Sequence, residues 1–365
     1  MAFSYSANIS QMAEPNARGS FYDLVESNRS LLVPDFDKSD INNFIENTEQ
    51  FRAYYWYFFI ASAILVLPTV FGNLLIIVAL LRYSRLRRVK AYILIGNLAF
   101  ADLLIGLITL PMEMAILTNE RYADSVEFCF MHISFLFTNI GASVVNMFVL
   151  SIERFHAVVY PFQHQQRFTK RRIYITIAIA WLCTAVFGFS PLYTTLPLVD
   201  SKTFECRAHE VIPKWYMLTF NAVVVGVIGT STAFFVIIVQ IARRIMKSTQ
   251  NVDASFDRQR IRREIHHTRN MIIISGLFIV FWCPYCIVSL IPSNPRNVTW
   301  MLVRSWLSSL GIINCCLNWM VYGVRSATFR AAFLSIVTGK CARKHYQLPL
   351  VSTWMKNIVF PLISK

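Results

Sequence analysis

The sequence predicts an all-α membrane protein in which seven helices cross the bilayer. Three observations support this prediction: only 15% of the 365 residues are charged, 55% are hydrophobic, and long stretches contain no Asp, Glu, Lys or Arg. Soluble proteins carry about 25% charged residues, because their helices expose a polar face to water. Buried helices of a soluble protein are therefore a poor explanation of these stretches.

Each predicted span is long enough to cross the hydrocarbon core, which takes about 20 helical residues. Six of the spans carry no charge, and the second holds a single carboxylate, Asp102. In chain order the spans are 53–81, 91–112, 128–152, 173–199, 215–242, 270–295 and 305–324. The chain therefore divides into an outer segment, 1–53, which is polar and expected to be flexible, and a bundle over 54–324.

The basic residues predict the orientation, because short cytoplasmic loops are rich in Lys and Arg. With the N-terminus outside, 25 of the 35 basic residues fall on cytoplasmic segments, which are 82–90, 154–172, 243–269 and the tail from 325. The net charge of +15 then faces anionic lipid and acidic partners, which argues against nucleic-acid binding. Glycosylation sequons fall outside on this topology, at Asn8, Asn28 and Asn297.

Polar side chains within the spans are candidates for function, because each is costly in hydrocarbon. Asp102 is the acid in the middle of a span, and its cost favours a role that depends on the state of the protein. Asn73, Ser143, Asn314 and Asn318 can join it in a cluster that would hold a sodium ion, hold a proton or link helices. For Asn73, a hydrogen bond that links two helices is the favoured explanation.

Charged residues close the third span at its cytoplasmic end. Arg154 follows Glu153 directly, and Glu264 stands before the sixth span. An arginine at a span end often only anchors the helix at the lipid surface. Here the two carboxylates can pair with Arg154, and the pairing would form a latch that breaks when the sixth helix moves.

The sixth span combines a proline with bulky aromatic residues. Pro284 removes a backbone hydrogen bond and kinks the helix, and Trp282 lies two residues before it. Phe278 lies one turn earlier. Taken alone, ordinary aromatic packing is the simpler explanation of these residues. Cys283 and Cys286 form a lone CxxC pair within this apolar run, which gives a zinc site little support.

Together, in order and at matching depths, these residues resemble the rhodopsin-like (class A) G-protein-coupled receptors over roughly residues 54–337. The resemblance is carried by Gly72-Asn73, Asn97 to Leu103, Cys129, Glu153-Arg154-Phe155, Trp181, and Phe281 to Tyr285. Each motif is weak alone, and the ordered set is specific. The resemblance does not indicate a ligand subfamily.

The resemblance implies roles for the residues it covers. Cys129 and Cys206 would form an outer disulfide, and Arg154 would engage a heterotrimeric G protein once freed from Glu153 and Glu264. Asp102 would line a sodium-type allosteric site with Ser143, Asn314 and Asn318, and no other metal or cofactor is indicated. The activation switch would comprise Phe278, Trp282, Pro284, Asn318 and Tyr322.

At the cytoplasmic end, the resemblance implies an amphipathic helix on the membrane surface over 325–338 and a tail over 339–365. Cys341 would be a palmitoylation site. The protein would be a multi-pass plasma-membrane receptor and not an enzyme. One departure stands out: Trp319 replaces the proline expected between Asn318 and Tyr322, which puts the kink of the seventh helix in doubt. Gly226 and Phe234 are two further departures, in the fifth helix.

The resemblance also bears on the ligand. Leu136 stands where amine receptors carry an aspartate, and Ile312 stands where photoreceptors carry the retinal lysine, which disfavours both ligands. By family position the ligand pocket would comprise Glu113, His132, Leu136, Phe137, Tyr285, Ser289 and Arg304. Glu113 and Arg304 would read a peptide or a zwitterion, unless they pair with each other. We expect a peptide, with a small carboxylated or lipid ligand as the alternative.

The leading hypothesis is thus a receptor that promotes nucleotide exchange on a G protein, and no catalytic constellation is visible. The missing proline supports a second hypothesis, a non-signalling receptor-like protein that acts as a ligand sink or heterodimer partner. A transporter or channel is a third, disfavoured because no inverted repeat is present.

Overall fold

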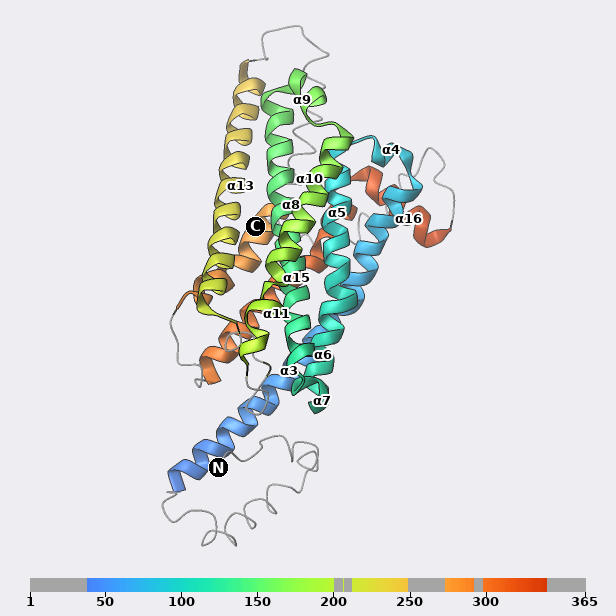
Figure 1. Ribbon diagram of the computed structural model, residues 1–365. Helices are drawn as coiled ribbons and strands as arrows, with labels where there is room; N and C mark the ends of the chain where they lie inside the picture. Colours follow the sequence, from blue (N-terminus) through green and yellow to red (C-terminus); the bar gives the residue numbers. More distant parts are fainter. Residues whose placement is uncertain (1–37, 200–205, 207–211, 249–272, 292–297, 340–365) are drawn as a thin grey trace.

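The computed structural model describes residues 38–199, 206, 212–248, 273–291 and 298–339, and every regular element in these ranges is a helix. The long helices run side by side as a bundle in which α8 is surrounded by its neighbours (Figure 1). The all-helical class predicted from the sequence is confirmed. The helices are α3 (Lys38–Arg82), α4 (Ser84–Arg87), α5 (Lys90–Leu104), η2 (Ile105–Thr109), α6 (Leu110–Thr118), α7 (Glu120–Ala123), α8 (Val126–Val159), α9 (Pro161–Arg167), α10 (Lys170–Gly188), α11 (Ser190–Thr194), η3 (Leu196–Leu198), α13 (Lys214–Ser248), α15 (Val298–Arg325) and α16 (Ala327–Thr338).

Six stretches of these helices are long and apolar enough to cross a membrane: Trp56–Arg82, Lys90–Thr118, Val126–Val159, Lys170–Leu198, Lys214–Ile241 and Leu302–Arg325. They coincide with the predicted spans one to five and seven. The sixth predicted span appears as the shorter apolar helix Ile273–Ser289, and the residues just before it lie outside the described part of the chain.

The first helix is longer than the sequence analysis expected. α3 begins at Lys38, so its first turns fall within the segment that was expected to be flexible. Residues 38–53 contain neither Gly nor Pro, the two residues that most strongly interrupt a helix. An apolar span that is already helical can therefore propagate its helix into this polar sequence at little cost per residue.

The second span is not one regular helix. A π-helical segment, η2, separates α5 from α6, and Pro111 lies in the first turn of α6. A π turn takes up an extra residue, so it rotates everything that follows by about 100° about the helix axis. Residues before and after η2 therefore face different neighbours.

α8 is the centre of the bundle. It packs against α13, α10 and α5, while α3 packs against α15 and α5. Buried side chains occur along its length, from Cys129 to Ala157. Because polar residues of α8 share this interior, they are held close to the polar residues of α5 and α15.

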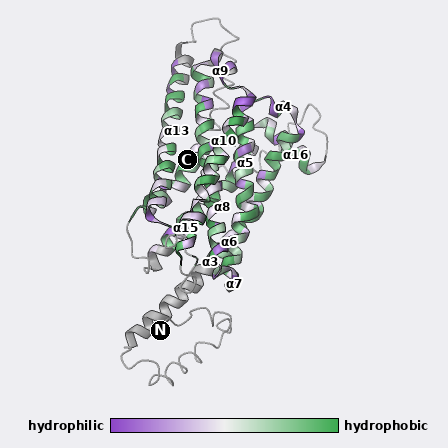
Figure 2. Cartoon of the chain, in the orientation of Figure 1, coloured by the Kyte–Doolittle hydropathy of each residue, from purple (hydrophilic) through white to green (hydrophobic). Residues whose placement is uncertain are grey.

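The outer surface of the bundle is apolar along most of the length of the helices (Figure 2). Leu67, Leu182 and Ile64 are each at least 65% exposed, and they lie on α3 and α10. Large exposed apolar patches are rare on soluble monomers. Here they form the face that contacts hydrocarbon, so the confirmed spans also explain the low charge of the chain.

The two ends of the bundle differ. At one end, which we call the disulfide end, Cys129 at the start of α8 is bonded to Cys206, with their Cα atoms 5.6 Å apart. The opposite end, the Arg154 end, carries α9 and α16. Ser326 caps α16 by accepting from the Phe329 N–H, and Gly339 ends it with φ of 66°. Phe329 and Phe333 of α16 are buried against the bundle.

Candidate functional site

A polar cluster around Asp102 lies in the middle of the bundle. The Asp102 carboxylate on α5 is 1% exposed. Asn318 of α15 donates from Nδ2 to Oδ2 at 2.7 Å, and Ser143 of α8 donates from Oγ to Oδ1 at 3.3 Å. The Cys315 thiol also lies close to this carboxylate, which the sequence analysis did not anticipate. Three helices therefore meet on one carboxylate.

The same cluster contains acceptors that have no partner among the described residues. These acceptors are the Oδ1 atoms of Asn314 and Asn318, which are both buried. No hydrogen bond joins Asn314 to Asp102 in the described part of the chain, so the structure joins Ser143 and Asn318 to the carboxylate more directly than Asn314. Carboxylate, hydroxyl and amide oxygens are ligands that hard cations prefer. This donor set fits the sodium ion that the resemblance implies.

Asn73 links two helices by a hydrogen bond. Its Nδ2 donates to the carbonyl of Thr69 in its own helix and to the carbonyl of Cys315 in α15, both at 2.9 Å. Asn73 is fully buried. The geometry agrees with the structural role favoured for this residue.

At the Arg154 end, a buried ion pair closes α8. Arg154 donates from Nε to Glu153 Oε2 at 2.5 Å and from Nη2 to Oε1 at 2.7 Å. Glu153 and Arg154 are 0% and 3% exposed. A bidentate pair of this kind is strong and geometrically specific. Glu264, the second expected partner, lies outside the described residues.

His164 completes this ion pair, and the sequence analysis missed it. Its Nε2 lies 2.9 Å from Glu153 Oε1, and it stands on α9, eleven residues further along the chain. The ring also stacks on Phe168, with 5.3 Å between centroids. No periodicity connects α8 to the short α9, so only the path of the connecting turn brings His164 to the carboxylate.

The aromatic residues of the helix Ile273–Ser289 form a stack above the centre of the bundle. The Phe278 and Trp282 rings are 6.0 Å apart, and Trp282 meets Tyr285 edge-on at 6.1 Å. Trp282 lies so close to α15 that a Cβ atom added to Gly311 would come within 2.9 Å of its ring. A rotation of Trp282 therefore requires α15 or its own helix to move.

The seventh helix shows what replaces the missing proline. α15 runs as one α-helix from Val298 to Arg325. The Trp319 indole lies against Gly72 of α3 so closely that a Cβ atom added at Gly72 would overlap it. Trp319 also meets Phe71 edge-on at 6.3 Å. Tyr322 is 1% exposed and packs against Phe329 of α16 at 5.2 Å.

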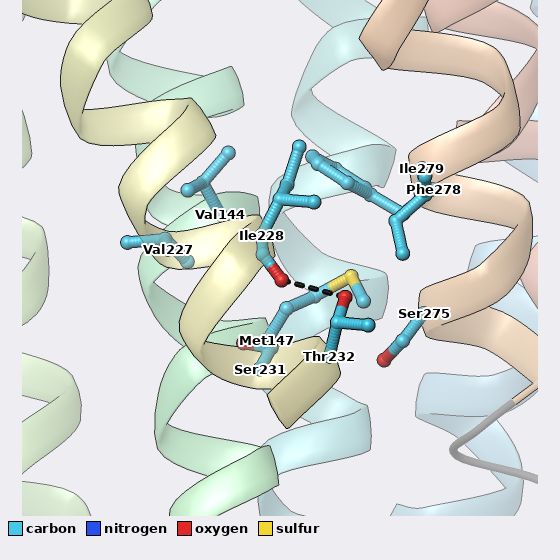
Figure 3. A pocket seen from close by; sticks show the side chains of 9 residues that line it. All are labelled: Val144, Met147, Val227, Ile228, Ser231, Thr232, Ser275, Phe278 and Ile279. Carbon is cyan, nitrogen blue, oxygen red and sulfur yellow. Dashed lines mark hydrogen bonds between the residues drawn. The ribbon is translucent and has the colours of Figure 1, made fainter. Parts of the chain in front are cut away.

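A small cavity lies between α8, α13 and the helix Ile273–Ser289 (Figure 3). Its volume is about 10 Å³, which is the space of one water molecule. Figure 3 shows the Met147 side chain between Thr232 of α13 and the residues of the helix Ile273–Ser289. None of the residues expected to bind the ligand lines this cavity.

The residues expected to bind the ligand lie toward the disulfide end, and several already make contacts within the bundle. Phe137 packs edge-on against Tyr216 and Phe220 of α13, at 5.1 and 4.7 Å. Ser289 donates to the carbonyl of Cys286 at 2.9 Å. Leu136 packs against the hydrophobic core. His132 has a buried Nε2 without a partner in the described ranges.

Glu113 and Arg304 do not form the pair that was considered as an alternative. Glu113 accepts a hydrogen bond from Ser62 of α3 at 3.2 Å. Arg304 donates from Nη2 to the carbonyl of Ile291 at 2.7 Å, on the side of the sixth helix. Each of the two side chains is therefore engaged with a different neighbour. Asn8, Asn28, Asn297 and Cys341 lie outside the described residues.

Comparison with known proteins gives a family match that spans most of the bundle. Residues 72–322 match the family model described as 7 transmembrane receptor (rhodopsin family). This range contains the Asp102 cluster, the disulfide and the Glu153–Arg154 pair.

Individual relatives are similar over most of their lengths. Trace amine-associated receptor 13c of Danio rerio is 25% identical over 295 residues, which cover 77% of this chain and 85% of the relative. Trace amine-associated receptor 365 of Petromyzon marinus is 28% identical over 292 residues, covering 76% and 79%. The human (Homo sapiens) 5-hydroxytryptamine receptor 4 is 23% identical over 313 residues, covering 78% and 80%. These names give no support to the peptide ligand expected from the sequence.

Proposed function

Because this chain belongs to the rhodopsin family of seven-transmembrane receptors, and is therefore a G-protein-coupled receptor rather than an enzyme, we propose that it detects a small extracellular amine. The N-terminus and the disulfide end would lie outside the cell, and the Arg154 end would face the G protein. The relatives named for trace amines and 5-hydroxytryptamine support the amine. The amine replaces the peptide that the sequence alone favoured.

The observation that carries the proposed output is the Glu153–Arg154 pair. The Nε and Nη2 atoms of Arg154 both donate to the Glu153 carboxylate, and the pair is almost fully buried. Separating a buried, hydrogen-bonded ion pair is costly unless another group replaces the lost partner. A G protein that engages Arg154 supplies such a group, and Glu264 would add to the latch in the resting state.

The proposed route from the ligand to Arg154 runs through the centre of the bundle. Trp282 lies against Gly311, and Asn318 is bonded to Asp102. A ligand that displaces Trp282 would shift α15 and with it the amide of Asn318. A sodium ion held by Asp102, Ser143 and the unpaired oxygens of Asn314 and Asn318 would favour the resting state, because it would hold α5, α8 and α15 together.

A second candidate function is a receptor-like protein that binds its ligand without signalling. The observation that favours it is Trp319, which stands in place of a proline and packs α15 onto α3. A helix held in this way resists the movement that signalling requires. The two functions predict different responses to a substitution of Arg154.

The test is G-protein dissociation in cells, measured by energy transfer between Gα and Gβγ for each G-protein subtype. The full chain is exposed to a panel of primary amines and, as a comparison, to peptides. We expect an amine response that Arg154→Ala reduces at least tenfold. Arg82→Ala is the matched control, because Arg82 is an exposed arginine at the same end of the bundle.

An unchanged response in Arg154→Ala would refute the proposed coupling site. Silence of the wild-type chain across all subtypes, with normal surface expression and ligand binding, would favour the non-signalling function. A response to peptides alone would refute the amine.

The proposed topology has its own test. Asn8, Asn28 and Asn297 would carry glycans, and Cys341 would carry a palmitoyl chain beside α16. Glycosidase treatment should increase the gel mobility of the wild-type chain and leave the triple Asn→Gln variant unchanged. Hydroxylamine-sensitive acyl exchange should label the wild type and not Cys341→Ser. A wild-type mobility that the glycosidase leaves unaltered would contradict the outer position of the N-terminus.

A further inference from the structure

The amine proposed above needs a counter-ion, and the usual position cannot supply it. Leu136 is apolar and packs against the core. The rest of α8 from Cys129 to Ser143 carries no acid either. A charged ammonium placed in a low-dielectric bundle without an anion is strongly disfavoured. Either the ligand is not an amine or another helix holds it.

The membrane spans offer few carboxylates. The described spans contain four acids, Asp102, Glu113, Glu127 and Glu153. Glu153 is paired with Arg154, and Asp102 is hydrogen-bonded deep in the middle of the bundle. Glu127 is exposed in the first turn of α8. Glu113 is therefore the acid that is both inside a span and within reach of the disulfide end.

Glu113 has no cationic partner in the part of the chain that the structure describes. Its one hydrogen bond comes from the neutral hydroxyl of Ser62, which is itself 4% exposed. Arg304 donates instead to the Ile291 carbonyl, and no ion pair joins it to Glu113 in the described ranges. An ionisable side chain inside a span, held by one neutral donor, is a candidate for binding a charged ligand.

The backbone explains why Glu113 points toward α3. It lies eleven residues after Asp102, so a regular helix would return it to nearly the same face. The π turn of η2 intervenes and rotates the following residues by about 100°. Asp102 consequently contacts α8 and α15, whereas Glu113 contacts Ser62 of α3. Eleven residues also carry it about 16 Å closer to the disulfide end.

We propose that Glu113 and Ser62 bind the ammonium group of the ligand, between the first and second helices, in place of an acid on the third helix. This inference rests on the proposed amine receptor and deepens it. A primary ammonium has three N–H donors, which match the two carboxylate oxygens and the Ser62 hydroxyl oxygen. The hydroxyl can accept from the ammonium while it donates to Glu113. The site therefore selects primary amines over quaternary ones, which have no N–H.

The experiment measures ligand-induced thermal stabilisation of the purified full chain and G-protein dissociation in cells. The probes are 2-phenylethylamine, 5-hydroxytryptamine and their N,N,N-trimethyl derivatives. Glu113→Gln keeps the shape of the side chain and removes its charge, and we expect it to weaken primary-amine binding by roughly 10- to 150-fold. Ser62→Ala should weaken it by roughly 3- to 10-fold. The trimethyl derivatives should bind the wild type at least tenfold more weakly than the primary amines.

Glu127→Gln is the matched control, because it removes an exposed carboxylate at the same end of the bundle. Its affinity should equal that of the wild type. Leu136→Asp in the Glu113→Gln background restores an acid at the third-helix position, so it should recover amine binding. This recovery would also show that Glu113→Gln is folded.

Equal losses in Glu113→Gln and Glu127→Gln would overturn the inference, as would full affinity in Glu113→Gln. Equal affinity of the primary and trimethyl ligands would overturn the hydrogen-bonded geometry with Ser62. Failure of every amine to stabilise the wild type, with Arg154-dependent G-protein output intact, would overturn the amine site and leave the coupling function standing. Normal amine binding, together with a G-protein output that does not depend on Arg154, would support the amine site and refute the coupling site.

Discussion

Replacement of Gly72 by alanine tests whether Trp319 fixes α15 to α3. An added Cβ atom at Gly72 would overlap the Trp319 indole, and the indole is a rigid ring that cannot bend away. The two helices must therefore separate or Trp319 must leave its rotamer. Overpacking of this kind costs about 1–3 kcal/mol.

The same substitution brings a gain of up to about 1 kcal/mol, because alanine favours a helix over glycine. Gly226→Ala separates the two effects, since nothing lies within 4 Å of a Cβ atom at Gly226 in α13. Gly226→Ala therefore gains the helix propensity of alanine and introduces no steric overlap. The difference between the two variants is thus the cost of the overlap, about 1–3 kcal/mol, or roughly 2–10 °C in apparent Tm.

The assay is thermal inactivation of the purified chain in detergent at one scan rate, with the wild type, Gly72→Ala, Gly226→Ala, Trp319→Phe and the double variant Gly72→Ala/Trp319→Phe. The smaller ring should relieve part of the overlap, so the double variant should be more stable than the sum of the single changes predicts. Equal Tm values for Gly72→Ala and Gly226→Ala would refute the packing of Trp319 on Gly72, and additivity in the double variant would refute their contact.

Three further predictions address the remaining sites. Gly311→Ala crowds the Trp282 ring and should raise basal G-protein dissociation several-fold; a basal output equal to wild type would count against the role of this contact. Asp102→Asn should abolish the effect of sodium on amine affinity, measured in sodium against N-methylglucamine buffers; a retained sodium effect would move the ion elsewhere. His164→Phe keeps an aromatic ring but loses the hydrogen bond to Glu153, so amide hydrogen exchange in α9 should increase about tenfold, and unchanged protection would show that the ring alone holds α9.

The spans and the class of the fold were predictable because hydropathy and length alone decide whether a segment partitions into lipid. Residues 128–152, for example, contain no Asp, Glu, Lys or Arg and make up most of the length of α8. The Glu153–Arg154 pair could also be predicted from the sequence, since the two residues are adjacent in the chain. No knowledge of neighbouring helices is needed for either inference.

The composition of the Asp102 cluster was only partly predictable. Ser143 and Asn318 contact the carboxylate, whereas the contact of Cys315 was not anticipated and Asn314 makes none that is direct. Which of several residues on α15 meets Asp102 depends on the rotation of that helix by a fraction of a turn. A sequence pattern determines a face of the helix but not this rotation.

The amine question shows the same limit. The sequence places a leucine at position 136 and suggests that an ammonium has no counter-ion. Only the tertiary structure shows that the π turn directs Glu113 toward Ser62 and that Arg304 is engaged elsewhere. A π turn has no reliable sequence pattern, because it arises from the packing of the helix as a whole.

Seven membrane-crossing helices could be predicted from hydropathy along the chain, because transfer of apolar residues into hydrocarbon is a local, additive property of each segment. The tertiary structure decided which side chains meet: Trp319 on Gly72, His164 on Glu153 and Ser62 on Glu113. Contacts between helices depend on rotation, local π turns and close approach at glycine, which are properties of the packed bundle rather than of any one segment.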